Sequence, residues 1–144
     1  MSLNLGSQFK SSFIFLESAI KNKDYELKIY GNDYPTKDGT AIRDYIHVID
    51  LVYVHILAIK ALINNKKHDN IYNIGYGHGY SVFEIVNSVQ EIFKTKISYK
   101  ISDRRPGDPP VLIADSRKLR EDFNWEPKFD DINEMIISAS KFIQ

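Results

Sequence analysis

A charged, turn-rich segment at residues 31–48 holds the first side chains that could bind an anion. Arg43 carries a planar guanidinium that stays charged at neutral pH and fits a phosphate group. Tyr45 would point to the same side of an extended chain, because residues two positions apart share a face. A surface ion pair between Arg43 and Asp44 or Asp50 is the competing interpretation. The spacing alone leaves phosphate binding and a structural ion pair both open.

A second charged segment, residues 103–110, is too rich in proline to be anything but a loop. Arg104 and Arg105 are adjacent there, directly before a Pro-Gly turn. Two neighbouring guanidinium groups could bind a diphosphate, while Asp108 could accept a hydrogen bond from a sugar hydroxyl or orient an arginine. The alternative is a solvated charged loop without a ligand.

Gly75, Gly77 and Gly79 lie between a predicted strand and a predicted helix, where phosphate-binding glycine loops occur. The dinucleotide-binding pattern Gly-x-Gly-x-x-Gly fails, because position 80 is Tyr80. We therefore expect a connection whose glycines adopt positive φ. His47, between two apolar residues, is expected to be buried and bonded to the backbone rather than to act as a base or a metal ligand.

The composition limits the classes of partner. The chain has 144 residues, a size suited to one domain, and its 19 basic residues balance 19 acidic ones. No overall field therefore attracts nucleic acid or an anionic membrane, and neither is an expected partner. The absence of cysteine excludes disulfides, thiolate nucleophiles and cysteine-bound metals, and it fits a cytoplasmic location. No apolar run approaches the ~20 residues of a membrane span.

Helices and short strands alternate along the chain, which predicts a small mixed α/β domain of about four helices and several short strands. Residues 1–10 are expected to be a disordered start or a cloning remnant, and residues 11–144 to form the domain. The helical pattern covers residues 11–22, 51–64, 82–93, 116–123 and 132–142, and the strand pattern covers residues 27–30, 42–48, 71–74 and 97–101.

Capping and turn residues mark the ends of these elements. The expected N-caps are Asp50 for the second helix, Asp115 for the fourth, and Asp130 or Asp131 for the last. Ser81 followed by Glu84 is a capping box, and Asp38-Gly39 is a turn signal that could be the tip of a hairpin.

The run of residues 31–48 resembles a signature of UDP-glucose 4-epimerases, members of the extended short-chain dehydrogenase/reductase superfamily. Three further stretches follow in that family's order, at residues 71–75, at residues 104–109, and at residues 114–116 with 124–127. The resemblance implies an isomerase of galactose metabolism, which interconverts UDP-glucose and UDP-galactose through a 4-keto intermediate. It also implies that this chain is the UDP-sugar-binding region.

The resemblance assigns part of the chain to the nucleotide. Lys28, Ile29 and Tyr30 would lie along the uracil, mostly through backbone bonds and packing. Arg43 and Arg105 match the diphosphate-binding arginines of the family. The residue types and the resemblance therefore point to the same two arginines.

The remaining implied contacts involve the two sugars. Tyr45 lies beside the first arginine, and Asp108 matches an acidic residue that holds the ribose. Leu112 occupies a position where family members carry a bulky Tyr or a small Cys or Ser, a choice linked to acceptance of N-acetylated sugars. A leucine there leaves acceptance of UDP-GlcNAc open.

The resemblance implies a longer enzyme, whose N-terminal Rossmann half carries the NAD motif and a catalytic Tyr-x-x-x-Lys. No tyrosine of this sequence has a lysine four positions later. We therefore expect no catalytic residues here, no NAD bound to this chain and no turnover by it alone. The helix at residues 50–64 and the strand at residues 71–74 would pack beside the Rossmann half, so their apolar surface should be bare here. We expect it to be covered by self-association, for example as a homodimer, or by rearrangement.

Three alternatives stay open at this point. The chain could belong to another UDP-sugar 4-epimerase, acting on UDP-arabinose or UDP-GlcNAc. It could be a stand-alone nucleotide-sugar-binding module without catalysis, or a fragment with no function of its own.

Overall fold

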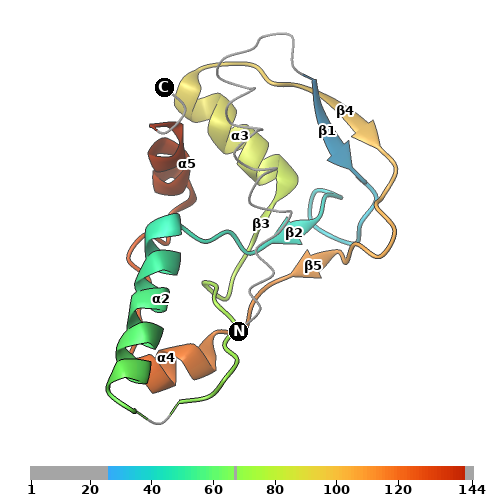
Figure 1. The fold of residues 1–144 in the computed structure, drawn as a ribbon. Coiled ribbons are helices and arrows are strands. Elements are labelled where there is room, and N and C mark those ends of the chain that lie inside the picture. The colour runs from blue at the N-terminus through green and yellow to red at the C-terminus, as the bar shows by residue number, and fades with distance from the viewer. Residues whose placement is uncertain (1–25, 67, 142–144) are drawn as a thin grey trace.

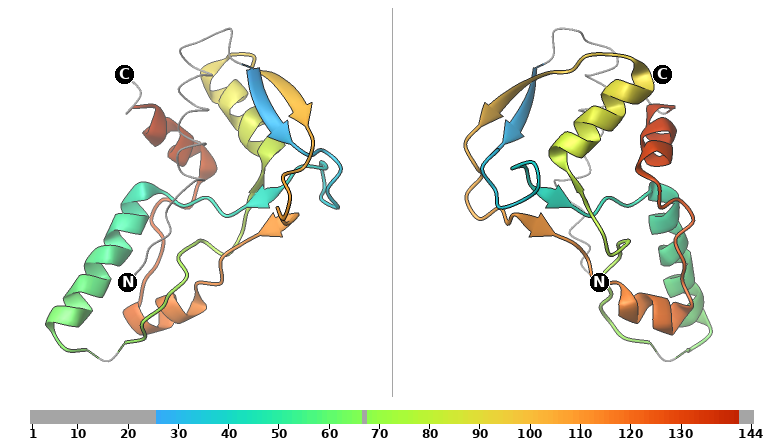
Figure 2. Two further views of the ribbon diagram at one scale, coloured as in Figure 1. Left: turned by 45° about the vertical axis from the view of Figure 1, so that its right-hand side comes forward. Right: turned by 180° about the vertical axis from the view of Figure 1, so that it is seen from behind.

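The computed structural model describes residues 26–66 and 68–141, and within them it has four helices and five short strands (Figure 1). The predicted mixed α/β class is confirmed. The strands lie toward one end of the molecule, and two of the helices, α2 (Val48–Ile63) and α4 (Arg117–Phe123), lie at the other end (Figure 2). The predictions for residues 1–22 and for Phe142 lie outside the described residues.

The strands form two small sheets. In the first, β1 (Glu26–Tyr30) pairs in parallel with β4 (Ser98–Ser102), with Tyr30 opposite Ser102. In the second, β2 (Ile42–Arg43) lies between β3 (Tyr80–Ser81), which is antiparallel to it, and β5 (Val111–Leu112), which is parallel. The strands predicted over residues 27–30 and 97–101 are confirmed to within one residue.

The proposed hairpin at Asp38-Gly39 is wrong, because β1 and β2 belong to different sheets. The extended segment predicted over residues 42–48 is a strand only at Ile42–Arg43. Beyond it the backbone finds a partner outside the ladder, since the amide of His47 donates to the hydroxyl of Tyr76 at 3.0 Å.

One hydrophobic core lies between the β1/β4 sheet and the helices α3 (Val82–Phe93) and α5 (Ile132–Ser140). Its buried members are Ile29, Val86, Val89, Ile97 and Ile136. The predicted capping box at the start of α3 is confirmed, with the Ser81 hydroxyl accepting from the Glu84 amide at 3.0 Å. This cap ends the connection from β3 and directs the apolar face of α3 toward the sheet.

A second core joins α2 to α4 and to the chain that follows α4. Its buried members are Val54, Tyr76, Leu119, Trp125 and Met135. Trp125 is 1% exposed, and the guanidinium of Arg120 lies 5.5 Å from its ring centroid. The segment after α4 therefore returns along α2 and leads into α5, as Figure 1 shows.

The N-cap of α2 is His47 rather than the predicted Asp50. His47 Nδ1 accepts from the Ile49 amide at 3.1 Å, and its ring stacks on Phe129 with centroids 4.5 Å apart. His47 is thus buried and bonded to the backbone, as predicted. Asp50 lies one turn inside the helix, where its carboxylate accepts bonds from the Lys128 and Phe129 amides.

Two further predictions are corrected. Residues 71–74 form no strand, because no described strand pairs with them. The N-cap of α4 is Ser116 rather than Asp115, although Asp115 does accept from the Arg117 amide at 3.1 Å. At α5 the cap is Asp131, one of the two predicted residues, and the helix ends at Ser140.

The outer side of α2 is apolar and exposed. Its residues at helical spacing are 50%, 48%, 41%, 55% and 74% exposed in chain order, and we call them the α2 apolar face: Ile49, Val52, Ile56, Ile59 and Ile63. Ile71 nearby in the chain is 79% exposed. The bare apolar surface expected from the sequence is confirmed. Among the described residues, no helix is both long and apolar enough to cross a membrane.

Candidate functional site

Two loops run side by side and bring the predicted site residues together. Residues 31–41 lead from β1 to β2, and residues 103–110 lead from β4 to β5, so each loop starts at one parallel pair and ends at another (Figure 1). The Gly31 amide donates to the Ser102 carbonyl at 2.8 Å, and the Ile42 amide donates to the Pro110 carbonyl at 2.8 Å. Backbone bonds thus align the two loops at both ends.

Arg43 is tied to the second loop. Its Nη2 lies 2.7 Å from Asp108 Oδ1, and its Nη1 donates to the Pro109 carbonyl at 3.0 Å and to the Ile42 carbonyl at 2.7 Å. The side chain is only 11% exposed. The alternative pairing with Asp44 or Asp50 is therefore wrong, because Arg43 pairs with another candidate residue across the two loops.

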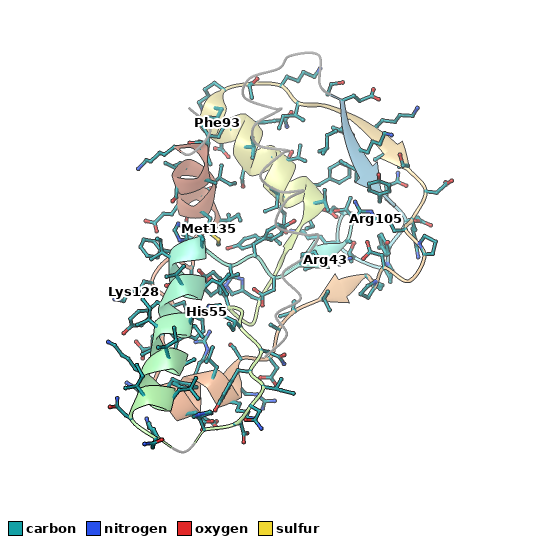
Figure 3. The ribbon with its side chains drawn as sticks, viewed as in Figure 1. Arg43, His55, Phe93, Arg105, Lys128 and Met135 are labelled. Atoms are coloured by element: carbon teal, nitrogen blue, oxygen red, sulfur yellow. The ribbon has the colours of Figure 1, made fainter. Side chains whose placement is uncertain are left out.

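Arg105 leaves its charge available. Its guanidinium carbon lies 4.0 Å from the centroid of the Tyr30 ring, and among the described residues no carboxylate pairs with it. Stacking of this kind orients a guanidinium while its N–H groups still face outward. Figure 3 shows Arg105 and Arg43 on the same side of the molecule, where the two loops leave the β1/β4 sheet.

Arg104, which spacing alone could not separate from Arg105, faces the other loop. Its Nε donates to Asp33 Oδ1 at 2.6 Å, and its guanidinium lies 4.2 Å from the centroid of the Tyr34 ring. The hydrogen bond from Arg104 lowers the pKa of Asp33 below its usual value. The two adjacent arginines therefore do not form one paired clamp.

The other predicted site residues divide into exposed and buried ones. Lys28 is exposed, and Leu112 on β5 is 50% exposed and lies opposite Arg43 in the strand register. Ile29 is 1% exposed within the first core, so only its backbone is free for a ligand. Tyr45 packs against the second core, and burial raises the pKa of its hydroxyl to about 12.

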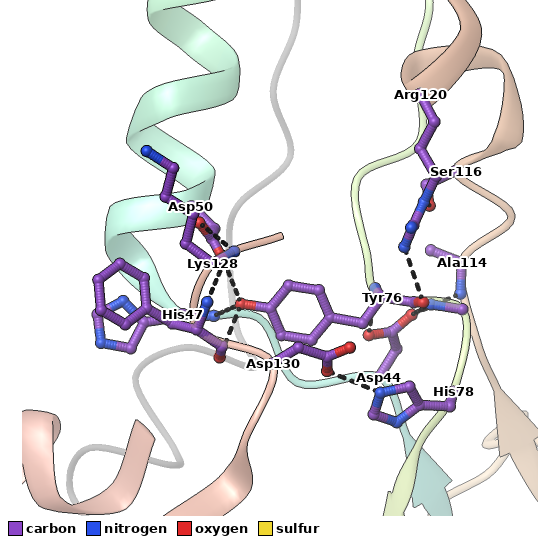
Figure 4. A network of polar contacts seen from close by, with 12 residues as sticks. Asp44, His47, Asp50, Tyr76, His78, Ala114, Ser116, Arg120, Lys128 and Asp130 are labelled. Carbon is purple, nitrogen blue, oxygen red and sulfur yellow. Dashed lines mark hydrogen bonds and ion pairs between the residues drawn. The ribbon is translucent and has the colours of Figure 1, made fainter. Parts of the chain in front are cut away.

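The Gly75–Gly79 connection binds a carboxylate of the protein itself. Asp44 accepts from the Tyr76 amide at 3.1 Å, the Gly77 amide at 3.2 Å and the Ala114 amide at 3.1 Å (Figure 4). A side chain on Gly75 would place its Cβ 2.4 Å from Asp44 Oδ2. The amides that a phosphate would need are therefore already used, and the loop is a structural junction. Of its three glycines, Gly77 has the expected positive φ, at 85°.

Tyr76 joins this junction to α2. Its backbone is bound by Asp44, and its hydroxyl lies 2.8 Å from Asp50 Oδ2 while accepting from the His47 amide at 3.0 Å (Figure 4). Burial, together with the neighbouring Asp50 carboxylate, raises the pKa of the Tyr76 hydroxyl. The network fixes the backbone between β2 and α2, and with it the end of the strand that carries Arg43.

A third polar cluster fixes the loop at residues 31–41. The Asp38 carboxylate accepts from the Thr40 amide at 2.9 Å and from the hydroxyls of Thr40 and Ser81. Thr40 is fully buried and Ser81 is 3% exposed. The loop is thus attached to the start of α3. Within the described residues, no group of three or more His, Asp or Glu side chains is placed to hold a metal ion.

Comparisons with known proteins show the family of this chain. A family model described as GDP-mannose 4,6 dehydratase matches residues 4–137. A UDP-glucose 4-epimerase of Lacticaseibacillus casei is 48% identical over 113 residues, which are 78% of this chain and 34% of that protein. The chain spans about a third of the length of the curated relatives it matches.

Solved structures share the fold. One is the UDP-glucose 4-epimerase from Bifidobacterium longum in complex with NAD+ and UDP, 35% identical with a TM-score of 0.80, matched over 94% of this chain and 39% of that one. Another is the UDP-Glc/GlcNAc 4-epimerase from Campylobacter jejuni, 36% identical with a TM-score of 0.80, matched over 99% of this chain and 44% of that one.

Proposed function

Since this chain belongs to the GDP-mannose 4,6-dehydratase family, we propose that it forms the nucleotide-sugar-binding part of a UDP-glucose 4-epimerase. The observation that carries the proposal is a pair of contacts on the two loops, Arg43 with Asp108 and Arg105 with Tyr30, whose arginines lie on the same side of the molecule (Figure 3). Such a cluster offers two guanidinium groups, one carboxylate and one aromatic ring. That set matches a diphosphate, a ribose hydroxyl and a base.

The two arginines have different tasks in this proposal. Arg105, which no carboxylate of the described part of the chain pairs with, offers its guanidinium to the diphosphate, and its stacking on Tyr30 reduces the freedom lost on binding. Arg43 has five N–H donors, of which three bind Asp108, Pro109 and Ile42, so two remain for a phosphate oxygen. Asp108 keeps its second carboxylate oxygen for the ribose.

We propose that the uracil and the hexose bind at opposite ends of this group of residues. The backbone of Lys28–Tyr30 along β1 would contact the base, because the side chain of Ile29 is packed in the core. Leu112, exposed beside Arg43 on β5, serves the hexose. Tyr45, two residues after Arg43, packs against the second core and stays a proposed contact of the ligand beside that arginine.

NAD does not fit the residues described here. In the glycine-rich connection at Gly75–Gly79, the amides of Tyr76 and Gly77 donate to the Asp44 carboxylate, and that carboxylate would repel a phosphate. The 144 residues also hold no Tyr-x-x-x-Lys. We propose that this chain alone binds no NAD and does not turn over UDP-galactose. Formation of UDP-glucose from NAD and UDP-galactose by the isolated chain would overturn this part of the proposal.

The α2 apolar face is the proposed partner surface. Single exposed apolar residues are normal on a protein surface, but five exposed aliphatic side chains along one helix form a continuous patch of the kind that marks an interaction site. We propose that the face is covered in the longer enzyme by the remaining part of the protein, and that in the isolated chain it promotes self-association.

Calorimetry with UDP tests the binding site. The 144-residue chain should bind UDP, and Arg105→Gln or Arg43→Gln should weaken binding about tenfold each, because each removes a charge-assisted bond to phosphate. Arg117→Gln removes the arginine of an exposed ion pair with Asp115, and it serves as the control. No heat at about 1 mM UDP, or tighter binding of GDP than of UDP, would contradict the proposal.

A 4-epimerase that acts on UDP-GlcNAc or UDP-arabinose is a second candidate function, because of the residue at position 112, Leu112. Its half-exposed side chain is neither the bulkiest nor the smallest choice for a position beside the hexose. The Campylobacter jejuni protein is named for both UDP-Glc and UDP-GlcNAc. Competition of UDP-GlcNAc and UDP-arabinose against UDP-glucose for the wild-type chain, and for Leu112→Tyr, separates these readings.

A further inference from the structure

The position of Arg105 depends on how the loop at residues 103–110 is held. At its far end, Arg43 binds the Pro109 carbonyl and the Asp108 carboxylate. At its near end, the loop leaves β4 one residue after the Gly31–Ser102 backbone bond. Between these two anchors, the contacts of Arg104 join the loop to residues 31–34.

Arg104 makes several contacts with a short stretch of the other loop. Its Nε donates to the Asp33 carboxylate at 2.6 Å, its Nη2 donates to the Asp33 carbonyl, and its guanidinium lies 4.2 Å from the Tyr34 ring centroid. Tyr34 is itself 4% exposed, so Arg104 lies against a buried ring. A Cβ on Gly31 would lie 2.6 Å from the Tyr34 ring and 2.8 Å from Arg104 Cγ, so only glycine leaves room for both.

We infer that Arg104 is a positioning residue, which through Asp33 and Tyr34 holds the Arg105 guanidinium over Tyr30 and free for an anion. Neighbouring arginines in a loop would otherwise both sample many rotamers, and ordering them on binding would cost affinity. Here Arg104 is held by two hydrogen bonds to Asp33 and by the Tyr34 ring. Its neighbour Arg105 lies over the ring of Tyr30. The choice of anion, a nucleoside diphosphate, rests on the proposed function.

Asp33→Asn gives a test with a distinctive sign. Simple electrostatics predicts tighter UDP binding, since the variant loses a negative charge near an anion site. Positioning predicts weaker binding, by roughly fivefold, since Arg104 loses its charged partner. Arg104→Gln should weaken UDP binding to a similar degree, and the double variant should be no weaker than either single one, because both changes remove the same contact.

Asp115→Asn and Arg117→Gln are the matched controls. They change the same charges in an exposed Asp–Arg pair on another part of the chain, and they should leave UDP affinity unchanged. Circular dichroism and thermal unfolding should be close to wild type for all of these variants, because exposed ion pairs contribute little to stability. Unchanged or tighter UDP binding by Asp33→Asn would overturn the inference.

A measurement without ligand separates this inference from the proposed function. The guanidinium carbon of Arg105 lies 4.0 Å from the centroid of the Tyr30 ring, so the Nε–H proton bonded to that group should show a ring-current shift in NMR spectra. Its resonance is the one that disappears in Arg105→Gln. Asp33→Asn and Arg104→Gln should move it toward the position of a free arginine. If the wild-type chain binds no UDP, the proposed function fails, but the ring-current shift of Arg105 still tests the positioning role of Arg104. Loss of that shift in both variants supports the role, and its retention overturns it.

Discussion

The hydroxyl of Tyr76 lies 2.8 Å from the carboxylate of Asp50 in a buried part of the molecule. The same hydroxyl accepts from the His47 amide, and the same carboxylate accepts from the Lys128 and Phe129 amides. Three segments that are distant in the chain are thereby joined at the first turn of α2. The pair sets where the helix begins and how the strand before it, which carries Arg43, leaves the sheet.

Tyr76→Phe should therefore destabilise the fold. The ring would still fill its place in the second core, but the His47 amide would lose its acceptor and Asp50 would lose a donor. A buried group left without its partner costs about 1–3 kcal/mol, so the free energy of unfolding in urea should fall by that amount. Tyr53→Phe, which removes a hydroxyl from a ring that is 38% exposed, should change it little. Equal stability of the two variants would contradict the role of the network.

Gly75→Ala should be costly for a steric reason. The new Cβ would lie 2.4 Å from Asp44 Oδ2 and 2.6 Å from the Cβ of Ala114. Asp44 would have to move away from the three amides that it binds, which should destabilise the chain by about 2 kcal/mol or more in denaturant unfolding. Gly77→Asn is the control, since its Cβ would meet nothing within 4 Å and asparagine tolerates positive φ. A Gly75→Ala protein as stable as the control would refute the contact.

Alkaline pH should weaken the fold through buried tyrosines. The pKa of Tyr45 is raised by burial from 10.0 to about 12, and that of Tyr76 is raised as well. Above about pH 10 the unfolded chain loses these protons before the folded chain does. The contribution of these tyrosines to the free energy of unfolding is therefore fully present below about pH 10 and falls between about pH 10 and 12. Urea unfolding at a series of pH values should show this fall. Tyr45→Phe should make it shallower, and an unchanged slope would count against the burial of that hydroxyl.

The α2 apolar face should control self-association of the isolated chain. Ile59→Glu places a charge among exposed aliphatic side chains and should shift sedimentation profiles toward monomer. Lys60→Glu changes the charge at an exposed position next to the face and should leave association unchanged. A wild-type chain that stays monomeric at high concentration would contradict the proposed use of this face.

Local sequence patterns predicted the elements that depend on neighbouring residues. The capping box at Ser81 and Glu84 is confirmed, as are β1 and the approximate extent of α2 and α3. The bonds that define these features join residues only a few positions apart, so the residues that form them are visible in the sequence itself. The motif at residues 31–48 likewise pointed to Arg43 before its partner was known.

Only the tertiary structure decided which distant group each side chain meets. Asp50 was predicted as an N-cap, but its partners Lys128 and Phe129 lie 78 and 79 positions away, and their amides bind its carboxylate inside the fold. Residues 71–74 have the composition of a strand, yet a strand needs a neighbour, and no described strand pairs with them. Both errors arise because a local pattern cannot state which segment folds against it.

At the site, too, the residue types follow from the sequence, whereas the partners of those residues depend on long-range folding. The sequence by itself determined the residue types at the site, a guanidinium at Arg43 and another in the Arg104-Arg105 pair, together with the turns that hold them. The tertiary structure decided that Arg43 binds Asp108, that Arg104 binds Asp33, and that Arg105 lies over Tyr30 with no carboxylate partner among residues 26–66 and 68–141. Two parallel strand pairs place the two loops in register, and that long-range pairing gives adjacent arginines different partners.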